Sequence, residues 1–212
     1  MRITAEWIMS QPNFGGADAL ARGWFLNRFF VPRFPEGATV KDLAIALKES
    51  GRPQSESMDR ALLSMCHHLA AQLPVPTFLE FVVARIQETA PLWPSEHEQA
   101  LMEGLEAVSE LMKAEEAALA PARDTLLEVK TLSEAVPRPF RHGCEAVLYT
   151  LAAAIAYRLG HDPLCISGGA AYALECAVRS ECGLSWAQIL DALAPEVDVP
   201  NVPPQAVSCP VN

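Results

Sequence analysis

The sequence lacks the long apolar runs that identify membrane proteins and secreted proteins. Its longest apolar run, residues 146–157, is about 12 residues long, whereas a membrane-spanning helix needs roughly 20. The first residues also contain no apolar stretch behind a basic start, which is the mark of a secretory signal. We therefore expect a cytoplasmic protein that makes no membrane contact.

Basic charge is scarce as well. The 212-residue chain has 16 Lys and Arg against 26 Asp and Glu, which gives a formal net charge of −10. Residues 80–135 hold twelve acids and four bases, whereas residues 1–60 hold seven acids and eight bases. Because contacts to phosphates need clustered Lys and Arg, we expect no direct nucleic-acid binding. The acidic segment either binds a basic surface of another protein or only keeps the chain soluble.

Strand-like alternation of apolar and polar residues is absent, whereas helical spacing and helix-end signals recur throughout. We therefore predict an all-α fold, a compact multi-helix bundle of about nine or ten helices. Pro32 and Pro35 are expected to end the second helix, and Thr77, Ser95 and Ser185 to cap three later ones. The predicted helices span residues 4–9, 17–30, 40–50, 55–72, 78–88, 95–119, 121–135, 141–159, 167–182 and 185–193.

Residues 142–182 should form the hub of the bundle. The segment is rich in alanine and almost free of charge, and Gly-His-Asp-Pro divides it into two helices. Alanine favours helix and allows a helix to approach its neighbours closely. We predict one helical domain over residues 1–194, with a small N-terminal lobe at 1–54 as the one plausible subdivision. The proline-rich tail, 195–212, is predicted to be extended or disordered.

Paired cysteine motifs are also missing, although the chain has six cysteines. No CxxC pair is present, and the spacings match no zinc module, so we expect buried free thiols and neither a metal nor another cofactor. In Cys66-His67-His68, adjacent side chains point about 100° apart on a helix and cannot easily share one ion. Cys66 should pack inside, with both histidines at the margin of the core.

One thiol meets part of the requirement for a nucleophile. Cys165 precedes the predicted helix that begins at Ser167, and His161 is nearby in the sequence. A helix N-terminus and a neighbouring base are the features that activate a cysteine. An enzyme that uses Cys165 and His161 is therefore one alternative, against the simpler interpretation of a packed thiol and a loop histidine.

Aromatic residues gather at 24–34, WFLNRFFVPRF, which holds five aromatics and two arginines. In the predicted helix 17–30, Leu20 and Trp24 lie near one face and Arg22 lies elsewhere. Five aromatics exceed what one helix face should bury, and Trp and Arg are enriched at binding hot spots. The stretch either packs in the core or forms a partner or self-association surface. The candidate contacts on that surface are Trp24, Arg28 and Arg33.

The opening MRITAEWI…ADALARGWFLNRFF…FPEGATVKDLAIALKESGR, within residues 1–50, resembles the start of uncharacterised phage and prophage proteins. Those begin with an MKITxEW-like segment, a small-residue helix ending in WF, and FPxG before a short helix. Here an extra VPR stands before Phe34-Pro35-Glu36-Gly37. The alanine-rich hub also resembles helical bacterial immunity-type domains. Together these resemblances imply a small accessory protein of a mobile element that acts on another protein.

These observations favour a non-catalytic bacterial or phage accessory protein that works by protein–protein contact, as an inhibitor or immunity factor would. Its predicted docking face is the acidic region between residues 95 and 135, and its partner would present a basic surface. The candidate contacts there are Glu103, Glu106 and Glu110, which lie off the apolar side of their helix. A homodimer or structural component joined through the aromatic N-terminal lobe is a further alternative.

Overall fold

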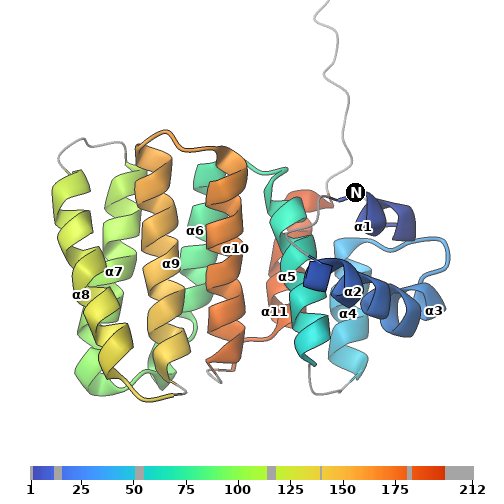
Figure 1. Ribbon diagram of the computed structural model, residues 1–212, viewed down its shortest axis with the longest axis horizontal. Coiled ribbons are helices and arrows are strands. Elements are labelled where there is room, and N and C mark those ends of the chain that lie inside the picture. The colour runs from blue at the N-terminus through green and yellow to red at the C-terminus, as the bar shows by residue number, and fades with distance from the viewer. Residues whose placement is uncertain are drawn as a thin grey trace, which may run out of the picture.

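The computed structural model describes residues 2–11, 16–50, 55–113, 118–138, 140–180 and 183–198, and it confirms the all-α bundle (Figure 1). These residues contain an isolated β-bridge between Ile3 and Ala38 and no β-strand. The elements are α1 (Ala5–Ser10), α2 (Gly16–Phe25), the π-helix η1 (Leu26–Phe30), α3 (Val31–Arg33), α4 (Val40–Ser50), α5 (Glu56–Ala70), α6 (Val75–Gln87), the 3-10 helix η2 (Ala90–Leu92), α7 (Ser95–Met112), α8 (Leu119–Ala135), α9 (Phe140–Arg158), α10 (Pro163–Arg179) and α11 (Trp186–Val197).

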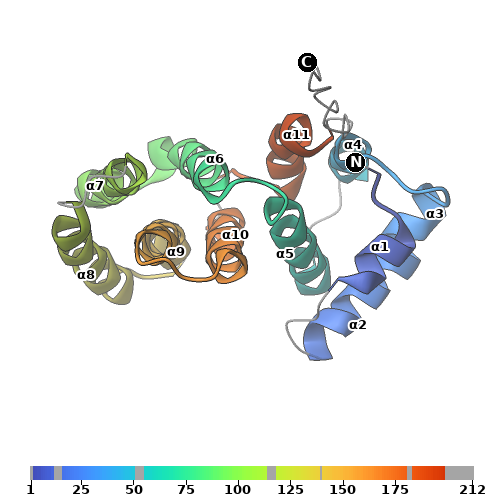
Figure 2. The ribbon, with the colours of Figure 1, turned by 90° about the horizontal axis from the view of Figure 1, so that it is seen from above.

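The helices form two groups that meet at α5. In one group α9 packs against α6, α7, α8 and α10 and is left open on one side, between α8 and α10, as the view from above shows (Figure 2). In the other, α1 to α4 lie with α11, so the last described helix packs on the N-terminal part of the chain. Buried apolar side chains form one continuous cluster from Ile3 to Val197 that runs through both groups.

The predicted hub is present in α9 and α10, which pack against each other. On α9 the side chains of Ala146, Ala153 and Ala154 are buried, and α9 buries residues on several sides because it has four neighbours. α9 ends at Arg158, close to the predicted end at residue 159, and Gly160 follows with a φ of +73°, a conformation that glycine adopts at low cost. Small side chains thus allow α9 to pack closely against several other helices.

The start of α10 corrects the sequence prediction by four residues. The helix begins at Pro163 rather than Ser167, because the Asp162 carboxylate accepts hydrogen bonds from the N–H groups of Leu164 and Cys165. Pro163 has no N–H and suits the first turn. Ser167 therefore lies inside the helix rather than at its start. The helix ends at Arg179, and residues 181–182 lie outside the described ranges.

Two further predictions were wrong, because Pro32 does not end the second helix and Thr77 does not cap α6. The helix at 17–30 continues through η1 to Arg33 with Pro32 in the first turn of α3, where the proline needs no intrahelical N–H bond. Likewise α6 begins at Val75 with Pro76 in its first turn, so Thr77 is inside the helix and is not its cap. In both places the proline, which has no backbone N–H, lies in the first turn, where N–H groups have no partner within the helix.

The ends of α7 and α11 differ from the prediction too. Ser95 is the first residue of α7 rather than its cap, and α7 ends at Met112 instead of residue 119. α11 does begin with the predicted capping box of Ser185 and Gln188, but it continues through Pro195 to Val197. Burying its apolar face against α4 outweighs the cost of a proline in the last turn. Of the predicted tail, 195–197 are helical and 199–212 lie outside the described residues.

Arg22 of α2 is buried although it is charged. Its guanidinium donates to the carbonyls of Ile8 and Gln11 at 2.9 Å and pairs with the Asp18 carboxylate at 2.9 Å. A buried charge is tolerated when it is paired and hydrogen-bonded in this way. Leu20, expected near the apolar face, is 78% exposed instead.

The histidines of α5 are buried rather than marginal. His67 Nε2 lies 2.9 Å from the Leu164 carbonyl oxygen, and its ring stacks on that of His68 with centroids 5.2 Å apart. The ring fits beside Gly168 of α10, where an added Cβ would lie 3.3 Å from His67 Cε1. Burial lowers the pKa of His67, and its hydrogen bond to Leu164 opposes that effect in part.

Close packing of α7 on α9 gives a direct prediction. A Cβ at Gly104 would lie 2.6 Å from Cγ1 of the rigid, buried Val147, so Gly104→Ala should lower the free energy of unfolding by about 1–3 kcal/mol. The control is Gly23→Ala in α2, where nothing lies within 4 Å and stability should rise by about 0.5–1 kcal/mol. Chemical denaturation measures both, and equal effects of the two changes would contradict the packing argument.

The lowered pKa of His67 predicts a pH dependence of stability. Below the unfolded value of 6.5, the unfolded chain binds a proton that the folded chain resists, so stability falls as pH decreases. His67→Gln removes this group, so the gap in unfolding free energy between wild type and variant should narrow from pH 7.5 to 5. Asp59 and Glu175, whose pKa values burial raises, act in both proteins alike. A difference in unfolding free energy between the two proteins that stays constant with pH would show that His67 does not cause this pH dependence.

Candidate protein-interaction surfaces

The acidic side chains predicted as a docking face lie together on α7. Glu103, Glu106 and Glu110 are all exposed, and their spacing of three and four residues puts them on one stripe. Gln99 donates to Glu103 at 2.9 Å, and Lys113 pairs with Glu110 at 2.6 Å. The opposite side of α7 faces the core through Leu101, Leu105, Val108 and Leu111. The carboxylates therefore take no part in packing and are available to a partner.

The neighbouring α8 carries mixed charge. Its exposed acids are Asp124, Glu128 and Glu134. Arg123 and Lys130 are exposed on the same helix, and Leu127 is 61% exposed. Because α8 carries both signs of charge, α7 presents the more uniformly negative part of the predicted face.

The core takes up most of the aromatic stretch. Phe25, Phe29 and Phe30 are buried, and the π-helical turn η1 lets residues four and five apart point to one side. The rings of Phe25 and Phe29 stack with centroids 5.5 Å apart. The Arg33 guanidinium lies 4.3 Å from the centroid of the Phe29 ring and donates to the Phe29 carbonyl. Arg33 is thus held against Phe29, and the residue remains exposed.

A smaller exposed stripe remains on α2, η1 and α3. Trp24 is 39% exposed, and Arg28, which follows it one turn later, is exposed too. Leu20 and Val31, which are 78% and 41% exposed, extend the stripe in both directions. Its apolar side chains could contact another protein, but nothing around them indicates the chemistry of such a partner.

Cys165 and His161 do not form the predicted activated pair. Both are exposed, and no hydrogen bond joins them within the described residues. The N–H groups of Leu164 and Cys165 at this helix end donate to the Asp162 carboxylate.

The other described cysteines are buried and protonated. Burial raises the pKa of the Cys66 and Cys176 thiols to about 12 and that of Cys144 to about 11. Cys182 and Cys209 lie outside the described residues. Across the part of the chain that the structure describes, no group of three or more His, Cys, Asp or Glu side chains could hold a metal ion.

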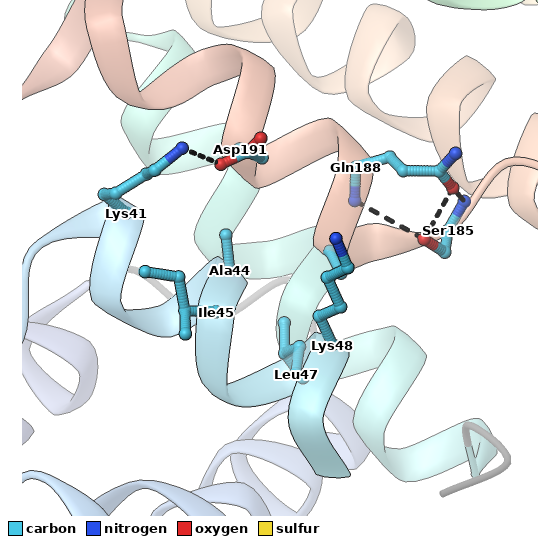
Figure 3. A pocket seen from close by; sticks show the side chains of 9 residues that line it. Lys41, Ala44, Ile45, Leu47, Lys48, Ser185, Gln188 and Asp191 are labelled. Atoms are coloured by element: carbon cyan, nitrogen blue, oxygen red, sulfur yellow. Dashed lines mark hydrogen bonds and ion pairs between the residues drawn. The ribbon is translucent and has the colours of Figure 1, made fainter. Parts of the chain in front are cut away.

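A groove of about 700 Å³ lies between α4 and α11 (Figure 3). Its apolar lining includes Ala44 and Leu47, and its polar side chains mostly engage one another. Lys41 pairs with Asp191 across the groove, while the side chains of the capping box at the start of α11 bond to each other. We interpret the groove as the seam that fastens α4 to α11. The ion pair joins residues 150 apart in sequence, so no local signal could have shown it.

An exposed tyrosine pair on α9 and α10 was not found by sequence analysis. Tyr149 and Tyr172 are 36% and 37% exposed, and their rings meet edge to face with centroids 4.8 Å apart. Glu145 lies one turn from Tyr149 and pairs with His142 at 2.8 Å. Burial and nearby negative groups raise the pKa of both phenols, that of Tyr172 to about 12. The feature of the sequence that could have indicated this pair is a bulky tyrosine within each of two alanine-rich helices.

Comparison with known proteins found no relative of this chain. No family model matches the chain, and no curated protein or solved structure gives a match. Among the described helices, none is long and apolar enough to cross a membrane.

The burial of the thiols predicts their reactivity. In a variant with Cys182→Ser and Cys209→Ser, a maleimide reagent should label native protein once, at Cys165, because only this thiol of the remaining four is exposed. Cys66, Cys144 and Cys176 should react only after unfolding. Mass spectrometry of the labelled peptides identifies which cysteines have reacted. A labelling rate at Cys165 far above that of a free thiol would revive the catalytic alternative.

Proposed function

We propose that this chain is a non-catalytic, cytoplasmic accessory protein that binds a protein partner through a basic surface of that partner. The proposal covers the roles of inhibitor and immunity factor, since both work by occupying another protein's surface. The observation that carries it is the stripe of exposed carboxylates on α7, formed by Glu103, Glu106 and Glu110.

Two features of the stripe support this use. First, α7 packs on α8 and α9 through its apolar side, so the carboxylates stand on a rigid helix whose position is fixed by the core. Second, the described α7 carries few positive charges near the stripe besides Lys113, which already pairs with Glu110. A fixed row of like charges attracts a complementary surface and speeds the encounter, with an effect that salt weakens.

Charge reversal tests the proposal. Glu103→Lys, Glu106→Lys and Glu110→Lys together should abolish capture of the partner from an extract of the native host at low salt. The wild-type interaction should itself weaken as salt rises, because exposed charges are screened. Affinity capture followed by mass spectrometry identifies what is retained, and circular dichroism melting verifies that the variant is folded.

The matched control changes the same amount of charge elsewhere. Glu36, Glu49 and Glu196 are also exposed but belong to the part of the molecule built from α1 to α4 and α11. Replacing these three by Lys should leave capture intact. If both triple variants retain the partner equally, the acidic stripe serves only solubility, and if both lose it, net charge rather than the α7 surface is responsible.

A further inference from the structure

The tyrosine pair lies on a surface that other helices leave uncovered. α9 and α10 lie side by side in both views of the molecule, and Tyr149 and Tyr172 each keep more than a third of their surface exposed (Figures 1 and 2). Tyrosines in such small-residue helices could turn their rings into the core, yet these two remain at the surface in contact with each other. Each ring is therefore held in place by the other.

Small residues lie beside the two rings. One turn along α9 lies Ala152, and one turn back along α10 lies Gly169, where an added Cβ would be 3.8 Å from Cβ of Ala153. The helices thus approach closely here, and only small side chains separate them. Ala152 and Gly169, the floor beside the rings, are partly exposed, so we expect room for a side chain from another protein to lie there against the tyrosines.

Two carboxylates lie near the pair. Glu145 is one turn from Tyr149, is 26% exposed and lies 2.8 Å from His142, and Glu175 is buried beside Tyr172 with its carboxylate paired to Arg179. Burial, and to a smaller extent a neighbouring thiol and these carboxylates, raise the pKa of the Tyr172 phenol. Aromatic faces are themselves electron-rich and attract cations, most often the guanidinium of arginine. The rings and Glu145 therefore favour the same kind of ligand.

We propose that Tyr149 and Tyr172, with Glu145, form a binding site for an arginine side chain of a partner protein. The guanidinium would lie over an exposed tyrosine face and pair with the Glu145 carboxylate, and its aliphatic stem would lie on the floor at Ala152 and Gly169. The site is distinct from the stripe on α7. It extends the proposed function, because both surfaces select a basic partner, but it does not depend on the α7 glutamates.

The experiment uses a hexa-arginine peptide as the probe and hexa-citrulline as its uncharged control. The chain has three tyrosines, so selective ¹³C labelling of tyrosine gives a simple NMR spectrum in which Tyr157 serves as an internal reference. The arginine peptide should shift the ring signals of Tyr149 and Tyr172 and leave Tyr157 unchanged. Equal shifts with hexa-citrulline, or shifts confined to Tyr157, would overturn the proposal.

Paired substitutions then test the role of the rings. Tyr149→Leu with Tyr172→Leu keeps apolar bulk but removes the aromatic faces, and should weaken binding about five-fold or more. Tyr149→Phe with Tyr172→Phe keeps those faces and should bind like wild type. Backbone amide shifts along α9 and α10 report binding in both variants. Equal affinity of the leucine and phenylalanine variants would contradict the cation–π contact.

Two further measurements distinguish arginine binding at this site from binding at the α7 stripe and from self-association. Repeating the titration in the Glu103, Glu106 and Glu110 triple-lysine variant should leave the Tyr149 and Tyr172 shifts in place, even if the α7 stripe binds nothing. Sedimentation of the leucine variant should show the same mass as wild type. A wild-type dimer that the leucine changes convert to monomers would identify the pair as a self-association contact and overturn the proposal.

Discussion

The close approach of α9 to its four neighbours is the constraint on which the rest of the molecule depends. A helix can pack this closely against four neighbours only if small residues lie where the backbones come nearest. Gly104 meets Val147 at the α7 contact, and Gly169 meets Ala153 at the α10 contact. Because the outer helices pack on α9 in fixed positions, their polar sides face solvent. The exposed acidic stripe on α7 is thus a consequence of how α9 is packed.

Local patterns predicted the helices whose signals lie within the helix, and failed where distant packing decided. Thr4, Ser55 and Ser185 cap their helices as their residue types indicate. The glutamate stripe of α7 was also predictable, because spacing alone determines which residues share a helix face. By contrast, Arg22 is buried by carbonyls from another segment, and Tyr149 meets Tyr172 only through the register of α9 against α10. Neither pairing has a local signal.

The surfaces available to partners differ in their physical character. The α7 stripe is charged and exposed, so its contribution to binding acts over a distance and decreases with salt. The tyrosine pair is partly buried and combines aromatic faces with a carboxylate, so its contribution acts only at contact and resists salt better. If both proposed sites bind, a basic partner would be attracted by the α7 stripe and oriented by the tyrosine pair.

The cap on α4 has a consequence for how the chain is made. The Asp198 carboxylate accepts hydrogen bonds from the N–H groups of Val40 and Lys41, at 3.1 Å each, and α11 covers the apolar side of α4. Ribosomes release the N-terminal helices first, yet α11, which covers α4, is made more than a hundred residues later. During synthesis Leu43 and Leu47 therefore stay uncovered by α11 until that helix emerges. The N-terminal part of this molecule can complete its fold only then, with the helices packed around α9 already available as its support.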